Sequence, residues 1–260
     1  MIAPGFAEFE SQMWIWIMAM IRPSAAMVVA PIFGAANIPV QIRIILAFMI
    51  GMVATNSVDF VLPTDTAISV GNILFIMGEV VTGLAIGFAL QLGYSSVLIA
   101  GETISNAMGL GFASMSDPQT GQSTPVIGQF LTIFATLLLL AIDGHLLLIA
   151  TIVKSYAALP PGFAMLDSGV LYSMVQFGGT LFSMGLLIAL PVGGALILIQ
   201  LMMGFLARTA PALNLFAVGI PGTITAGLIA LAVTAPIIAE TVIRALGMGL
   251  DQAAFVAGGG

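Results

Sequence analysis

The sequence predicts an all-α, membrane-associated protein. Of its 260 residues, 60% are hydrophobic and only 6% are charged, whereas soluble domains carry about 25% charged residues. The mean hydropathy is +1.19, and the apolar residues form stretches longer than the roughly 20 residues that a spanning helix needs. The chain also has 30 glycines. They favour helices packed closely on other helices, because lipid gives helices no hydrophobic reason to associate.

Six apolar stretches predict the helices, at residues 13–33, 42–62, 68–100, 126–153, 170–206 and 212–250. The fifth is too long for one straight span, because residues 168–207 hold no charge over 40 positions; as a helix they would measure about 60 Å. The stretch must therefore bend, break or leave the lipid, and Pro191, followed by Gly193 and Gly194, is the predicted position of a break. Arg208, Pro211 and Asn214 predict the turn that joins the last two stretches into a helical hairpin.

Composition excludes several classes of function. The chain has no cysteine, so disulfides and thiolate metal sites are not available, and we expect no cofactor. Eleven acidic and five basic residues give a net charge of −6, which leaves no basic patch for nucleic acid. No phosphate-binding loop is present. Because Glu8 and Glu10, and no Lys or Arg, precede the first apolar run, we expect no cleavable signal peptide.

The distribution of charge favours helices that pack mainly against protein. With six alternating spans, Arg43 and Arg208 fall on one side, while Lys154 and Arg244 fall on the other, so the basic residues do not decide the orientation. Arg22 lies inside the first stretch. Glu79 lies inside the third, where a lone charge facing lipid costs about 2.5 kcal/mol or more.

Glu79 admits two interpretations. It is part of an ion path, as in a secondary transporter with helices broken near Pro191, or it is a structural group that caps a helix or pairs with a basic group of a neighbouring chain. Glu102 follows 23 residues later, about 35 Å along a helix. The two carboxylates therefore do not form a catalytic pair, and an intramembrane enzyme lacks a credible set of catalytic residues.

Two short patterns predict local structure. Gly83 and Gly87 have the GxxxG spacing at which helices pack closely, although such pairs are common by chance in a glycine-rich chain. Asp143, Gly144 and His145 are typical of a turn or kink. His145 is the only histidine of the chain, so proton transfer or metal binding lacks partners. We expect a protein that is not an enzyme.

The segment GETISNAMGLGFASMSDPQTGQSTP, from Gly101 to Pro125, is predicted to be a long loop. Its only charges are Glu102 and Asp117. Mixed small polar and apolar residues are typical of a loop that is packed inside protein or closes a pore; a passive loop outside the membrane is the alternative. If the loop closes a pore, apolar side chains would exclude water and glycines would allow movement. The residues that would form this closure are Met108, Gly109, Leu110, Gly111, Phe112, Met115, Ser116, Asp117 and Gly121.

Several segments together resemble the FliR family of flagellar biosynthetic proteins, whose virulence counterpart is the SctT family of type III secretion. They are RPSAAMVVAPIFGAANIPVQIRIILA from Arg22, GETISNAMGLGFASMSDPQTGQSTPV from Gly101, DGHLLLIATIVKSYAALPPG from Asp143, ALPV from Ala189 and RTAPALNLFAVGIPG from Arg208. Each is a weak signal alone, and the ordered set is a strong one. The candidate structural and interface residues are Arg22, Pro31, Pro39, Arg43, Glu79, Glu102, Asp143, Gly144, His145, Pro191, Arg208, Pro211 and Asn214.

The resemblance implies a subunit of the flagellar type III export gate, a hetero-oligomeric helical assembly at the centre of the basal body in the bacterial inner membrane. Its partners would be several copies each of FliP-like and FliQ-like subunits, other export apparatus proteins and membrane lipid, and its substrates would be unfolded proteins. The family fold implies a FliP-like portion, residues 1–165, followed by a FliQ-like hairpin, residues 166–260, with much of the protein above the plane of the membrane. The loop at residues 101–125 corresponds to the plug of the family. A virulence secretion gate is the alternative.

Overall fold

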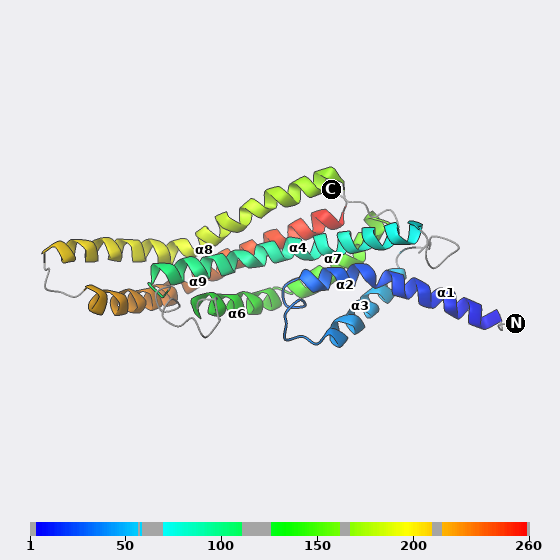
Figure 1. Cartoon of the computed structure of the whole chain (residues 1–260), viewed down its shortest axis with the longest axis horizontal. Coiled ribbons are helices and arrows are strands. Elements are labelled where there is room, and N and C mark those ends of the chain that lie inside the picture. Colours follow the sequence, from blue (N-terminus) through cyan, green and yellow to red (C-terminus); the bar gives the residue numbers. More distant parts are fainter. Residues whose placement is uncertain are drawn as a thin grey trace. The chain divides into compact units, whose positions relative to one another are not determined.

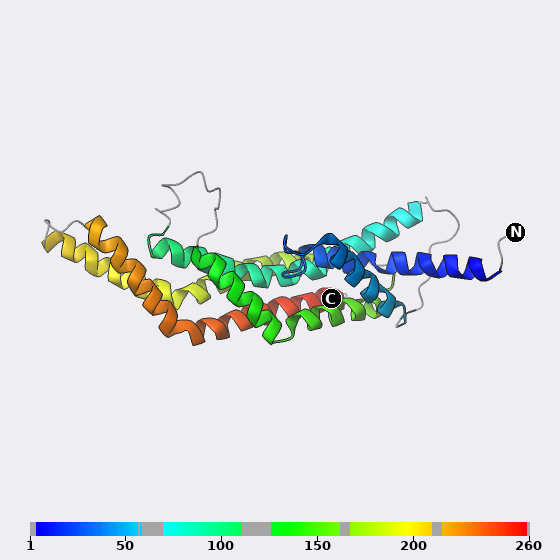
Figure 2. The ribbon, with the colours of Figure 1, turned by 90° about the horizontal axis from the view of Figure 1, so that it is seen from below.

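All regular elements in the described part of the chain are helices (Figure 1, Figure 2). The structure, a computed structural model, describes residues 4–56, 58, 70–110, 126–161, 167–209 and 215–258. The helices are α1 (Pro4–Ala19), α2 (Ile21–Val29), α3 (Val40–Thr55), α4 (Val70–Ala107), α6 (Val126–Ala141), α7 (Gly144–Ala158), α8 (Ser168–Thr209) and α9 (Leu215–Ala257). The all-α prediction is confirmed.

The helices correspond to the six predicted stretches, two of which are divided in two. The first stretch holds α1 and α2, and the fourth holds α6 and α7. Within the described ranges, four helical segments are long and apolar enough to cross a membrane, and the broken pair α6 and α7 makes a fifth candidate if it counts as one span. These lengths and compositions agree with a membrane protein.

Two predicted boundaries are wrong. The segment that begins at Gly101 is still helical as far as Ala107. Within it, the Thr103 hydroxyl donates to the carbonyl oxygen of Ile99 at 2.8 Å, so this polar side chain is satisfied by its own helix. The predicted break at Pro191 is not found either, since α8 continues through it. In apolar surroundings the backbone has few alternative partners, so a helix persists around one missing donor.

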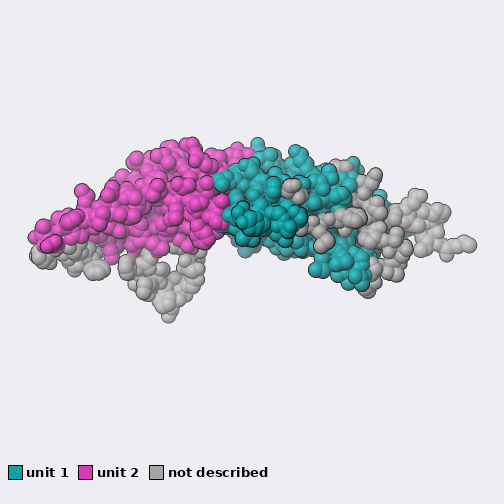
Figure 3. Space-filling view, turned by 90° about the horizontal axis from the view of Figure 1, so that it is seen from above, with its two compact units in different colours: residues 1–93, 143–178, 247–260 teal, residues 94–142, 179–246 magenta. Residues whose placement is uncertain are grey.

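The helices group into two compact units (Figure 3). Unit 1 comprises residues 1–93, 143–178 and 247–260, and unit 2 comprises residues 94–142 and 179–246. Because α4, α8 and α9 each contribute to both units, neither unit coincides with the predicted FliP-like or FliQ-like portion. That division of the chain at residue 165 stays a prediction.

Small residues and ring contacts hold the core of unit 1. Gly51 of α3 lies so close to α1 that an added Cβ would meet the backbone of Ala19 at 2.8 Å. Trp16 and Phe48 pack edge to face between the same two helices, with ring centroids 6.2 Å apart. Further along the unit, the backbone of Gly249 in α9 approaches Leu90 of α4.

Unit 2 packs the last part of α4 against α6 and α8. Gly101 and Gly128 meet with almost no side-chain volume between them, since a Cβ on Gly101 would lie 2.4 Å from the Cα of Gly128. The Tyr94 hydroxyl group lies 2.6 Å from the Thr136 hydroxyl group and donates to the carbonyl oxygen of Thr132 at 3.1 Å. On α8, Gly185 packs against the side chain of Ile99.

The predicted hairpin of the last two stretches is formed by α8 and α9. In unit 2, the Met203 side chain packs on Gly219 near the connection. In unit 1, the Gln252 amide donates to the Ser173 hydroxyl at 3.0 Å. The two pairs have the register of antiparallel helices. Arg208 lies in the last turn of α8, where positive charge is favourable; Pro211 and Asn214 lie outside the described residues.

Candidate functional site

Unit 1 contains a buried cluster of polar side chains centred on Arg22. Arg22 comes from α2, Glu79 from α4, and Ser155 and Tyr156 from α7, and all four side chains are fully buried. Burying a charge is costly unless it is paired and hydrogen-bonded. The contacts of these residues therefore decide whether the cluster is a stable structural feature or a reactive one.

The Arg22 guanidinium is bound on several sides. Its Nε and Nη2 atoms donate to the two carboxylate oxygens of Glu79, both at 2.9 Å. Nη1 donates to the Ser155 hydroxyl at 2.9 Å, and Nη2 also donates to the carbonyl oxygen of Leu159 at 2.9 Å. The guanidinium also lies over the ring of Tyr156, with the Arg22 Cζ atom 4.0 Å from the ring centroid. Bidentate, charge-assisted hydrogen bonds of this kind are the strong ones.

The neighbours of Arg22 are themselves held in place. The Tyr156 hydroxyl donates to the carbonyl oxygen of Ala19 at 2.7 Å, and the Ser155 hydroxyl donates to that of Ile152 at 2.7 Å. The cluster thus joins the end of α1 to α2, α4 and α7. Because Glu79 is paired with Arg22 through both of its carboxylate oxygens, the geometry supports a structural clamp.

This pairing corrects the expectation that Glu79 would pair with a basic group of a neighbouring chain. The partner is Arg22, 57 residues earlier in the same chain. Arg22 and Glu79 carry opposite charges inside apolar stretches, and this is the sequence signal for their ion pair. Ser155 and Tyr156 are not among the predicted site residues, because nothing comparable distinguishes their hydroxyl groups in the sequence.

Two glycines allow α2 to reach this position on α4, which confirms the predicted GxxxG contact. A Cβ on Gly83 would meet the carbonyl oxygen of Arg22 at 2.2 Å, and one on Gly87 would meet that of Ala26 at 2.3 Å. Glu79, Gly83 and Gly87 follow at intervals of four and share one face of the helix. The same face therefore supplies the carboxylate and the close approach that brings Arg22 to it.

The loop between α2 and α3 is organised by Arg43. Its Nη2 atom donates to the carbonyl oxygens of Ala35 and Ile38. The buried Pro31 begins this loop, and Pro39 ends it as the cap of α3. Ile32, a β-branched residue, has a φ of 70°, a strained conformation for such a side chain. Arg43 thus contributes to the structure of the loop.

The predicted kink at Asp143, Gly144 and His145 is confirmed. α6 ends at Ala141 and α7 begins at Gly144, and Asp143 between them has a left-handed φ of 55°. The Asp143 carbonyl oxygen accepts from the amides of Leu146 and Leu147 at 2.9 and 3.0 Å and so starts α7. His145 is half-buried, and among the described residues no group of three acidic, histidine or cysteine side chains is placed to hold a metal ion.

The described part of the predicted plug forms the end of α4. Gly109 has a φ of 83° and donates to the carbonyl oxygen of Asn106 at 3.0 Å, while the Leu110 amide donates to that of Ser105 at 3.0 Å. These two bonds are those of a left-handed glycine C-cap. Gly109 therefore ends the helix at a defined residue. Gly111, Phe112, Met115, Ser116, Asp117 and Gly121 lie outside the described residues.

The end of α4 is held by α8 and α9. Gln200 of α8 donates to the carbonyl oxygen of Ala107 at 2.7 Å, and the Thr223 hydroxyl of α9 donates to that of Met108 at 3.1 Å. The fully buried Met108 side chain packs on Gly227. Glu102, five residues before Ala107, is exposed. The predicted plug therefore begins at a point of unit 2 that contacts with α8 and α9 hold in place.

Large apolar side chains remain exposed along the hairpin. Val175 and Phe205 of α8 are 76% and 71% exposed, and Val233 of α9 is 73% exposed. Exposed apolar surface of this extent marks contact with protein or membrane. The only ion pair found there, Arg244 to Glu240 at 3.6 Å, is itself exposed and lies within the described part of α9.

Comparison with known proteins agrees with the sequence resemblance. The profile of the family described as "Bacterial export proteins, family 1" matches residues 13–248. The flagellar biosynthetic protein FliR of Pectobacterium carotovorum is 32% identical over 90% of this chain and 89% of its own length. The FliR proteins of Escherichia coli K12 and Bacillus subtilis 168 are each 32% identical, over 89% and 86% of this chain and 90% and 86% of their own lengths. The chain belongs to family 1 of the bacterial export proteins, the family that contains these flagellar FliR proteins.

Proposed function

We propose that this protein is a subunit of the flagellar protein export apparatus in the bacterial inner membrane. In this proposal it forms, with several copies each of FliP-like and FliQ-like subunits, the channel through which unfolded flagellar proteins leave the cytoplasm. The observation that carries the proposal is the match to relatives named flagellar biosynthetic proteins along nearly the full length of both chains. Because those relatives are flagellar, we favour this role over a virulence secretion gate.

The geometry agrees with a subunit that works by assembly and not by catalysis. The buried polar cluster is internally satisfied, with Arg22 taking both carboxylate oxygens of Glu79. A secondary transporter with Glu79 in an ion path needs that carboxylate to be accessible, and its predicted helix break at Pro191 is not found. The exposed apolar side chains of the hairpin suit contacts with neighbouring helices.

We further propose that the segment after Gly109 is the plug of this channel. Its anchor is the capped end of α4, which Thr223 and Gly227 of α9 hold at Met108. A plug needs such a fixed origin so that it returns to the same position after a substrate has passed. The few charges of the segment suit a channel that accepts many different unfolded chains.

Native mass spectrometry of the complex, extracted gently from the cells that make this protein, tests the assignment. We expect a single copy of this chain held together with several copies of two other small apolar proteins. In parallel, a strain that lacks the chain should release no flagellar proteins into the medium, and the wild-type gene should restore the release. A lone chain or a simple homodimer, with normal release in the deletion strain, would overturn the proposal.

A further inference from the structure

The end of α4 depends on side chains of two other helices. A helix leaves its last backbone carbonyl groups without a donor from the helix itself. At α4 the amides of Gly109 and Leu110 satisfy two of these groups, at 3.0 Å each. The next two carbonyl groups, those of Ala107 and Met108, accept instead from side chains outside α4. The glycine cap therefore does not complete the end of α4 by itself.

The two donors come from different helices of the hairpin. The Gln200 amide of α8 donates to the carbonyl oxygen of Ala107 at 2.7 Å, and the Thr223 hydroxyl of α9 donates to that of Met108 at 3.1 Å. The Thr223 hydroxyl also lies 3.0 Å from the carbonyl oxygen of Ile220 in its own helix. Because a hydroxyl group has a single proton, Met108 receives only a share of this bond. Both helices of the hairpin therefore contribute to the cap.

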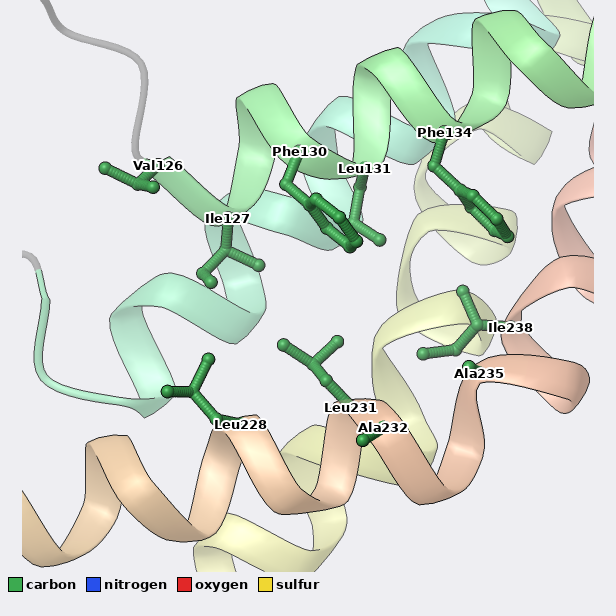
Figure 4. A pocket seen from close by; sticks show the side chains of 10 residues that line it. All are labelled: Val126, Ile127, Phe130, Leu131, Phe134, Leu228, Leu231, Ala232, Ala235 and Ile238. Atoms are coloured by element: carbon green, nitrogen blue, oxygen red, sulfur yellow. The ribbon is translucent and has the colours of Figure 1, made fainter.

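Side-chain packing fixes the same position. The Met108 side chain is fully buried over Gly227 of α9, where an added Cβ would lie 2.7 Å from the Met108 Cγ atom. From Leu228 onwards α9 lines an apolar hollow of about 420 Å³ whose opposite wall is α6 (Figure 4). The end of α4 thus contacts α9 just before this hollow begins.

Earlier along α4 the support is of a different kind. At Gly101 the backbones of α4 and α6 are in contact, since an added Cβ would lie 2.4 Å from the Cα of Gly128. Such a contact does not depend on a side-chain hydrogen bond. From Gly101 to Met108, the hydrogen bonds from other helices that the structure describes come from Gln200 and Thr223. The position of the last turn can therefore change while the packing at Gly101 stays intact.

We propose that Gln200 and Thr223 are positioning residues for the plug, because they cap α4 from outside and fix the residue at which the plug segment begins. This inference rests on the proposed plug and assigns its position to two side chains of the hairpin. Without them, the carbonyl groups of Ala107 and Met108 lose their donors, which favours fraying of the last turn. A plug of unchanged sequence would then close the channel less well, and a movement of the hairpin at these residues would move the origin of the plug.

Substitutions that keep side-chain volume test the proposal. Gln200→Met with Thr223→Val removes both donors. We expect the complex to assemble normally and the closed channel to conduct small ions about fivefold more than the wild type, roughly the factor by which the loss of one hydrogen bond shifts an equilibrium. Gln176→Met with Thr225→Val is the matched control. It removes an amide and a hydroxyl from the same two helices, where each bonds within its own helix, and it should conduct no more than the wild type.

A thiol at position 108 reports on the end of α4 directly. The chain has no cysteine, so Met108→Cys adds a single thiol at a position that is fully buried. Peptide mass spectrometry then measures how fast a maleimide alkylates this thiol in the reconstituted complex. With Gln200→Met and Thr223→Val, alkylation should be about fivefold faster, and with the control pair it should be unchanged. Thr223→Ser, which keeps the hydroxyl, should behave like the wild type in both measurements.

Removal of residues 111–121 separates the failure of this inference from the failure of the plug. If that deletion leaks and the variant without both donors does not, the plug assignment stands and the two residues do not position it. Faster alkylation without a leak would also overturn the inference, because the cap would then hold the helix end and not the plug. A deletion that does not leak would overturn the plug assignment and this inference with it. If the double variant does not assemble, Thr223→Val alone, which removes a shared bond, decides between the same outcomes.

Discussion

At the scale of single residues, the buried Arg22 connects α2 to two other helices of unit 1. Its guanidinium contacts α4 through Glu79 and α7 through Ser155 and Tyr156. Removing one partner of such a pair leaves an uncompensated buried charge, which costs about 3–5 kcal/mol, whereas replacing both partners by apolar groups is often nearly neutral. The stability of the unit therefore depends on each buried charge having its partner, and not on the presence of charge.

Arg22→Met should accordingly destabilise the protein by about 3–5 kcal/mol, while the double variant Arg22→Met with Glu79→Met should recover most of that loss. Thermal unfolding of the purified complex in detergent measures both, together with the amount of complex in the membrane. Arg244→Met is the matched control, because it breaks the exposed pair with Glu240 and should cost less than about 1 kcal/mol. A double variant as unstable as Arg22→Met would contradict the interpretation as a balanced clamp.

The residue scale also shows a limit of sequence reasoning. Arg22 and Glu79 stand out in the sequence because charges inside apolar stretches are costly. Their pairing cannot be predicted from the sequence, because it depends on how the helices that carry these two residues, 57 positions apart, cross. Met108 is a similar case: the sequence shows a flexible apolar side chain, and only the fold shows that it is fully buried against Gly227.

At the scale of elements, close approach between helices depends on glycines whose missing side chain leaves room for a neighbouring backbone. Gly87 of α4 faces the carbonyl oxygen of Ala26, whereas Gly178 of α8 has nothing within 4 Å of an added Cβ. Both lie inside helices, where alanine is intrinsically better than glycine by up to about 1 kcal/mol. The two positions thus separate packing from helix propensity.

We expect Gly87→Ala to destabilise the protein by about 1–3 kcal/mol, since α2 must move to admit the methyl group. Gly178→Ala should be neutral or raise stability by up to about 1 kcal/mol. Thermal unfolding of the two variants in parallel checks the pair. Equal effects of both substitutions would mean that α2 and α4 are not held in contact at Gly87.

Helices were predicted better than their ends and breaks. Each described helix overlaps one of the predicted apolar stretches, because sustained hydrophobicity is a property of the segment itself, although α1 begins nine residues before the first stretch. The end of α4 was placed too early, since Thr103 and Ser105 look like loop residues in isolation. In the fold, Thr103 bonds to its own helix, and the left-handed Gly109 sets the end. At Pro191 the sequence predicts a helix break that the structure does not have. Proline breaks helices in water, but α8 continues through it.

At the scale of the whole molecule, the chain combines a satisfied interior with an apolar exterior. The buried charges are paired within unit 1, while large apolar side chains such as Val175 and Phe205 are left exposed. Such a surface needs lipid or neighbouring subunits. In the proposed role as a channel subunit, the protein acts through its shape and its contacts.

The proposed plug predicts that the channel leaks ions when the segment is removed. Removing residues 111–121 while keeping Met108, Gly109 and Leu110 leaves the cap of α4 and its contacts with α9 intact. The complex should therefore still assemble, yet the closed channel should conduct small ions, because the apolar side chains that exclude water are gone. Conductance of the reconstituted complex measures the leak, and native mass spectrometry confirms assembly.

Substitutions that keep the length of the segment serve as controls. Phe112→Ser with Met115→Ser removes apolar bulk and should also leak, whereas Ser116→Ala keeps that bulk and should conduct no more than the wild type. An assembled deletion variant with unchanged conductance would show that the segment is a passive loop and that the channel is closed elsewhere. A leak in Ser116→Ala as large as that in the double variant would show instead that the seal does not depend on apolar side chains. The deletion therefore tests where the channel is closed, and the substitutions test whether apolar side chains close it.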